Sequence, residues 1–259
     1  MPGLLAKYEK AIPPPGPKSW SGPAKLLIFQ YGVHPLTKVP VPGYLIESAE
    51  GRRVLIDTGF PPCGSGPARA VHWFRVTPED HVLRRLNSIG LAATDIDWVI
   101  CSHFDPDHCG GNNMFPHAEF FVQRKHYEVA CSGLHERFEM VRAHWGHPGL
   151  CYTLIGGDQE VLPGIWLIET SGHVPGHQSV MVQLQSSRKV LLAIDAISSA
   201  AKLNSPTGRV HPFDMDADAT KKSISKLRTL IREHDIEQVF YGHDAIQWPL
   251  LLKAPDAYV

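Results

Sequence analysis

Short apolar runs separated by polar turns recur along most of the chain, and they predict a protein rich in β-strands. Runs of four to eight branched or aromatic residues bounded by turn-forming residues are typical of buried strands. We expect strands at residues 25–31, 44–47, 53–56, 98–101, 118–122, 165–169, 180–184, 190–194 and 238–241. The second and third of these predict a hairpin that turns at Glu50 and Gly51.

Three segments carry helical patterns instead. Thr77 is a good N-cap, Pro78 suits the first helical position, and the apolar stripe that follows predicts a helix that ends at Gly90. Residues 124–131 and 216–233 predict two more helices, the second of them amphipathic. Residues 132–150 show no period, and both a pocket wall and a plain surface insertion fit them.

The order of these elements predicts the fold class. Two β-rich halves, each with covering helices, indicate two packed mixed β-sheets flanked by helices, an α+β fold arranged as an αββα sandwich. A chain of 259 residues suits one domain, which we place at residues 25–259. The proline-rich residues 1–24 predict an arm on the surface or on a partner subunit, because proline disrupts helix interiors and central strands.

Composition narrows the classes of partner. A formal charge of −1 offers no electrostatic case for nucleic acid or an anionic membrane surface. No apolar run reaches the length of a membrane span, and no secretory leader opens the sequence. The five cysteines are odd in number and form no C-x-x-C pair, so we expect reduced thiols. These features predict a soluble, cytoplasmic protein. We expect a monomer or a homodimer, although none of these features decides between the two.

A polar cluster follows directly after the apolar run 98–101. His103, Asp105, Asp107 and His108 fall within six residues, and the glycine pair at 110–111 comes next. Imidazoles and carboxylates that meet at a strand end are what a metal site needs. A solvated turn that happens to hold two histidines is the alternative reading of this stretch alone.

Three other strand ends strengthen the metal hypothesis. His173, Asp195 and His243 each follow a short apolar run, so all these groups can gather along one edge of a core. Seven nitrogen and oxygen ligands are too many for one tetrahedral ion, but they suit two ions that share a carboxylate.

The order of these motifs resembles the metallo-β-lactamase superfamily, and within it the N-acyl-homoserine lactonase-like hydrolases. The resemblance covers roughly residues 25–258 and rests on the segments 44–47 with 55–59, 102–112, 171–179, 193–196 and 241–248, with a matching tail at 254–258. Five motifs in the right order are a specific signal.

The resemblance implies a role for each candidate residue. The first ion would be held by His103, Asp105 and His173, the second by Asp107, His108 and His243, with Asp195 bridging both. A water or hydroxide between the ions would be the nucleophile, and Asp107 would pass a proton to the leaving group, which makes Asp107 and Asp195 the candidate catalytic residues. Asp57 and His177 would orient ligand imidazoles, although His177 fits a purely structural role equally well.

Position 105 departs from the family pattern, because aspartate stands where a second histidine is usual. In formal counting, three carboxylates and a hydroxide neutralise two divalent ions, whereas the usual set leaves one positive charge. The ions are expected to be zinc, while the added oxygen ligand also suits iron or manganese. A carboxylate here also resembles the diiron branch of the superfamily.

Position 198 is a second departure, since Ser198 stands where the lactonases place a tyrosine that polarises the substrate carbonyl. Tyr241 or His211 could substitute, although each fits a structural role better.

From the motifs and the resemblance we expect a metal-dependent hydrolase that opens a lactone or another small-molecule carboxylic ester. A diiron protein that handles oxygen or peroxide, and a degenerate member that binds one ion or a ligand, are the alternatives.

Overall fold

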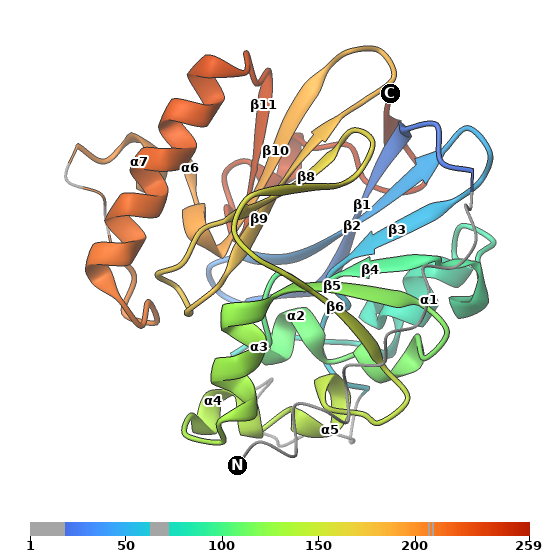
Figure 1. Ribbon diagram of the computed structural model, residues 1–259. Coiled ribbons are helices and arrows are strands. Elements are labelled where there is room, and N and C mark those ends of the chain that lie inside the picture. The colour runs from blue at the N-terminus through green and yellow to red at the C-terminus, as the bar shows by residue number, and fades with distance from the viewer. Residues whose placement is uncertain (1–18, 63–72, 207, 209) are drawn as a thin grey trace.

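The computed structural model describes residues 19–62, 73–206, 208 and 210–259. Two β-sheets pack face to face in the centre, with short helices on the outside of one sheet and a long helix on the outside of the other (Figure 1). This arrangement is the αββα sandwich that the pattern of the sequence predicts.

The first sheet has seven strands in the order β12-β1-β2-β3-β4-β5-β6. Their bounds are Ala257–Tyr258, Pro23–Val33, Pro40–Ser48, Arg53–Ile56, Trp98–Ile100, Glu119–Gln123 and Cys151–Ile155. Strands β1, β2 and β3 pair antiparallel, and the hairpin of β2 and β3 pairs Tyr44 with Ile56 as expected. From β3 to β6 the pairing is parallel, so the carboxyl ends of these strands share one edge of the sheet.

The second sheet has five strands in the order β11-β10-β9-β8-β7. They span Gln238–Tyr241, Lys189–Ile194, Gln178–Gln183, Ile165–Glu169 and Gln159–Leu162. Strand β11 runs parallel to β10, whereas the other neighbours are antiparallel. The ends of β10 and β11 therefore lie side by side.

Seven α-helices, most of them short, lie in the described part of the chain. Five follow strands of the first sheet or precede β6: α1 (Val82–Asn87), α2 (Pro106–Cys109), α3 (Arg124–Cys131), α4 (Glu136–Glu139) and α5 (Arg142–Trp145). The remaining two, α6 (Ala200–Asn204) and α7 (Ala217–Glu233), cover the second sheet. Figure 1 shows α7 along the outer face of that sheet and the green helices below the first.

Alternation along the strands divides the apolar residues into three layers. Leu26, Ile28 and Val180 lie in the central layer between the sheets. Leu27 and Val99 face the helices that cover the first sheet, and Ile224 of α7 packs on the second sheet's outer face. Neighbouring residues such as Leu26 and Leu27 thus serve opposite faces of one strand.

Two predicted segments differ from the structure. The helix expected from Thr77 is a 3₁₀ turn at Pro78–Asp80, and α1 starts only after an extended backbone at His81. Thr77 is the N-cap and Pro78 the first residue of this turn, as predicted, and the Asp80 carboxylate accepts bonds from the Thr77 backbone at 2.8 Å and from Arg85 at 2.5 Å. Residues 132–150 contain α4 and α5 rather than irregular chain alone, because Phe138 and Trp145 are buried in the core.

Strands β6, β7 and β12 had no counterpart in the sequence prediction. Most of the predicted arm lies outside the described residues. Strand β1 begins at Pro23, within the range assigned to the arm. Just before it, the Trp20 ring lies edge-on to Trp98 with centroids 5.8 Å apart. Among the described residues, no helix is long and apolar enough to cross a membrane.

Candidate metal centre

The central polar cluster sits where β4 ends. His103 follows that strand, Asp105 caps the N-terminus of α2, and Pro106 occupies the first helical position. Asp107 and His108 then lie in the first turn of the helix. Behind it, an ideal Cβ on Gly110 would come within 2.1 Å of the Pro61 backbone nitrogen, so only glycine lets the two chain segments approach.

The other candidate ligands lie at the ends of the second sheet's strands. His173 comes after β8, Asp195 directly after β10, and His243 after β11. Ile194, the last residue of β10, has a φ of 51°, which is rare for a β-branched residue and turns the chain sharply before Asp195. The strained backbone thus sets the direction in which the Asp195 carboxylate leaves the strand.

The structure brings all seven predicted side chains together in two adjoining groups. One group comprises His103, Asp105, His173 and Asp195, the other Asp107, His108 and His243, and within each group the ligand atoms lie within 4.8 Å of one another. Asp195 reaches both groups, with Oδ2 3.1 Å from His173 Nε2 and Oδ1 3.0 Å from His243 Nε2.

Each of the four histidines has its Nδ1 held by an oxygen of the protein. The four pairs are His103 with Ser102 Oγ (2.9 Å), His108 with Asp57 Oδ2 (2.8 Å), His173 with Asp214 Oδ1 (3.1 Å) and His243 with the Pro40 carbonyl (2.8 Å). This arrangement leaves every Nε2 directed at the carboxylates. Metal-binding histidines in proteins are commonly fixed in this way.

The donor set fits metal ions. His103 Nε2 and His108 Nε2 are buried without a hydrogen-bond partner, which is costly unless something binds them. Asp107 Oδ2 lies 3.6 Å from His108 Nε2 and 3.8 Å from His243 Nε2, a spacing that a central ion would span. Imidazole and carboxylate together suit zinc, iron or manganese.

The buried charges shift several pKa values. Burial and the neighbouring His108 lower the pKa of His103 to about 3, so its Nε2 carries a lone pair near neutral pH. Burial alone would lower the pKa of His108, but the carboxylates of Asp107, Asp195 and Asp57 raise it to about 10. Burial also raises the pKa of Asp107. A cation that binds here must therefore displace a proton from the second group.

Arg137 is a contact that the sequence prediction missed. This residue of α4 points at Asp105: Arg137 Nε donates to Oδ1 at 2.5 Å, and Arg137 Nη2 bonds Oδ2. The same Nη2 lies 2.7 Å from His173 Nε2, and Nη1 donates to the Phe213 carbonyl at 2.7 Å. The only available signal was the extra carboxylate at position 105, which calls for a cation nearby.

Lys202 and Asp214 are two further residues that the prediction missed. The Lys202 ammonium is buried and lies 3.3 Å from both the Asp195 carbonyl and Asp214 Oδ2. Asp214 in turn holds His173 through Nδ1. The buried ammonium of Lys202 thus contacts Asp214, which holds His173, and also contacts the backbone carbonyl of Asp195.

The remaining singled-out residues lie around this centre. His177 bonds Thr170 Oγ1 at 2.8 Å and accepts from the Asp195 backbone nitrogen at 3.3 Å, so it holds the backbone of that residue. The Ser198 carbonyl accepts from the His243 backbone nitrogen at 2.9 Å. His211 Nδ1 is engaged by the Phe213 backbone, while Tyr241 is half-buried on the outer face of the second sheet.

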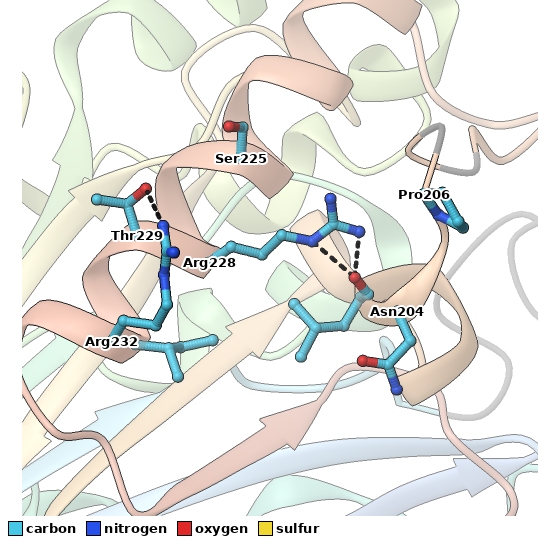
Figure 2. Close-up of a pocket in the computed structure, with 8 residues that line it drawn as sticks. Asn204, Pro206, Ser225, Arg228, Thr229 and Arg232 are labelled. Atoms are coloured by element: carbon cyan, nitrogen blue, oxygen red, sulfur yellow. Dashed lines mark hydrogen bonds between the residues drawn. The ribbon is translucent and has the colours of Figure 1, made fainter.

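A separate hollow lies between α6 and α7 and is lined by Asn204, Ser225 and Arg228 among others (Figure 2). The Arg228 guanidinium points at the end of α6 and donates to the carbonyls of Leu203 and Ser205. Its Nε and Nη2 are therefore occupied by the chain itself, and the hollow is lined by none of the candidate metal ligands.

Comparison with known proteins places this architecture in a family. The model of the metallo-beta-lactamase superfamily matches residues 36–243. An N-acyl homoserine lactonase of Bacillus thuringiensis is 34% identical over 221 residues, covering 82% of this chain and 84% of the relative. The lactonase AttM of Rhizobium radiobacter is 32% identical over 237 residues, covering 85% of this chain and 88% of the relative.

Solved structures agree with the sequence comparisons. A variant of the AiiA lactonase from B. thuringiensis, crystallised with N-decanoyl-L-homoserine at its active site, superposes with a TM-score of 0.77 at 29% identity. The match covers 92% of this chain and 100% of that structure. With the sandwich, the ordered motifs and these relatives in agreement, the chain belongs to the metallo-beta-lactamase superfamily.

Proposed function

We propose that this protein is a metal-dependent hydrolase that opens lactones or other small carboxylic esters, using up to two divalent metal ions with zinc as the first candidate. N-acyl homoserine lactones are the first substrates to test, because the curated relatives are N-acyl homoserine lactonases. Those relatives favour the hydrolase over a diiron protein that handles oxygen or peroxide.

One observation carries the proposal. All four imidazoles present Nε2 to a shared set of carboxylates while a protein oxygen holds Nδ1. Burial alone would not give the same orientation to four histidines that come from three strand ends and α2. A purely structural cluster would also pair its polar atoms, whereas His103 Nε2 and His108 Nε2 have no hydrogen-bond partner.

Bound ions would lower the pKa of a water molecule toward neutrality and polarise the ester carbonyl. The chain's own residues supply the rest of the chemistry. Asp195 would join both halves, because its two oxygens face different histidines. Asp107 is the residue proposed to carry a proton to the departing alcohol, since burial raises the pKa of its carboxyl group.

The experiment that tests this function measures hydrolysis after the chelator-stripped protein has been reloaded with zinc, manganese or iron. The panel comprises N-acyl homoserine lactones, simple γ-lactones and aryl esters. Hydrolysis should require metal and should fall at least about 100-fold in His108→Ala, which loses a ligand at the reacting centre. His117→Ala is the matched control, because His117 is an exposed histidine that bonds only the Ala93 carbonyl.

Equal hydrolysis by the parent and His108→Ala, or no turnover of any lactone or ester by the metal-loaded protein, would contradict the proposal. Three related predictions belong with it: a single domain over residues 25–259, a monomer or homodimer, and a cytoplasmic location. Light scattering on the purified protein measures the oligomeric state directly.

A further inference from the structure

Among the described residues, a guanidinium contacts the first half of the metal centre and none contacts the second. Arg137 Nε and Nη2 engage both oxygens of Asp105. Asp105 is also the position at which this chain departs from the ligand pattern of its family. The departure and the arginine therefore coincide in space, although they are 32 residues apart in the chain.

The guanidinium takes up the atoms that an ion in this half would need. Arg137 Nη2 lies 2.7 Å from His173 Nε2, whose opposite nitrogen is already engaged with Asp214. The ring nitrogen that would bind an ion thus lies against an N–H group of Arg137. Two of the four candidate ligands in this half, Asp105 and His173, are occupied together.

The arginine is held in this position by the surrounding chain. Its Nη1 donates to the Phe213 carbonyl at 2.7 Å, and its side chain is only 24% exposed. Three anchor points fix a planar guanidinium in one orientation, which a lysine cannot reproduce.

The second half has no such competitor among the described residues. Asp107, His108 and His243 approach one another and Asp195, and Arg137 forms no hydrogen bond with any of the three. Their other contacts hold the imidazole Nδ1 atoms and leave the Nε2 atoms toward the centre. An ion that binds in this half therefore has no guanidinium to displace.

The formal charges of the side chains also indicate that the first half binds an ion less readily than the second. Replacement of a neutral imidazole by Asp105 adds one negative charge to the centre, and the positive charge of the Arg137 guanidinium balances it. A second divalent ion placed within a few ångströms of that guanidinium would be repelled by it.

We propose that Arg137 acts as a built-in cation in the first half of the centre, so that the chain binds one metal ion tightly at Asp107, His108, His243 and Asp195, and a second ion only weakly at His103, Asp105 and His173. This inference rests on the proposed metal-dependent function. Arg137 is thus a positioning residue that sets metal occupancy.

The test is a calorimetric zinc titration of the chelator-stripped full chain, with elemental analysis of bound zinc. The parent should bind one zinc per chain tightly and a second at least about tenfold more weakly. Arg137→Gln should strengthen the second binding event by at least about tenfold, and Arg137→Lys should have a smaller effect because it keeps the charge but loses the fork.

Arg142→Gln is the matched control and should behave as the parent, because Arg142 carries the same charge but pairs with Glu139. Thermal melting provides a readout that does not involve zinc stoichiometry. Without metal, Arg137→Gln should melt below the parent, since it leaves Asp105 without its cation, whereas saturating zinc should raise its melting temperature more than that of the parent.

Two equivalent tight zinc ions in the parent would overturn the inference and leave the metal-dependent function standing. An Arg137→Gln titration that matches the parent would also overturn it. If Arg137→Gln does not fold, the parent's two affinities and the Arg137→Lys titration still decide the question. Failure of every form to bind zinc, manganese or iron would overturn both the inference and the proposed function.

Discussion

Asp57 holds His108 from 51 positions away in the chain, with its Oδ2 2.8 Å from His108 Nδ1. Asp57 follows β3 and His108 belongs to α2, and both are almost completely buried. The same carboxylate accepts from the Ser102 backbone at 2.8 Å and from Ser102 Oγ at 2.7 Å. One side chain therefore ties together the loop after β4 and the first turn of α2.

We expect Asp57→Asn to weaken zinc binding by about 10–100-fold, because loss of the carboxylate leaves the His108 ring less firmly oriented and less basic. Competition with a chromophoric chelator measures the affinity. Asp97→Asn is the control, since Asp97 bonds the Arg53 backbone and Arg52, away from the centre. An unchanged affinity in Asp57→Asn would show that the pair does not serve metal binding.

The metal-free protein should lose stability as the pH falls from about 6.5 to about 4, partly through His126. Burial lowers the pKa of His126 to about 4, and its Nε2 accepts from the Phe104 backbone nitrogen at 2.8 Å. In that window the unfolded chain binds a proton that the folded chain excludes, so unfolding becomes more favourable as the pH decreases.

His126→Gln should flatten this dependence by up to one proton, or about 1.4 kcal/mol per pH unit. Urea unfolding at several pH values measures the slope, and His117→Gln is the surface control. The same slope in His126→Gln and the parent would rule out His126 as a source of the acid sensitivity.

Lys202→Met should destabilise the protein by about 3–5 kcal/mol, the usual cost of removing one partner of a buried ion pair. Its ammonium and the Asp214 carboxylate are both buried, 3.3 Å apart. Denaturant unfolding measures the loss in the metal-free protein. The double variant Lys202→Met with Asp214→Asn should recover part of the stability, because it leaves no unpaired carboxylate; additive losses would argue against the pair.

Gly110→Ala should cost about 1–3 kcal/mol, because a Cβ there would collide with the Pro61 backbone and displace α2. The displacement should also weaken zinc binding, since α2 carries Asp107 and His108. Gly156→Ala is the matched control, as no atom lies within 4 Å of its Cβ position. Thermal melting and the zinc titration check both effects, and equal results for the two variants would contradict the close approach.

The sequence by itself determined the αββα sandwich and the positions of the seven candidate ligands. Short apolar runs define strands, and a polar residue directly after such a run lies at a sheet edge, where strand ends converge. The start at Thr77 was also predicted correctly, but the extended backbone at His81, which divides that segment into a 3₁₀ turn and α1, was not.

Only the tertiary structure decided which side chains surround the ligands. Arg137 and Lys202 lie in the short helices α4 and α6, and neither helix has a pattern that shows where its charge will point. Their directions follow from burial of neighbours such as Phe138, which fixes α4 against the core and turns Arg137 toward Asp105. Packing between distant segments sets such contacts. The aspartate at position 105 was therefore visible in the sequence, whereas its pairing with Arg137 was not.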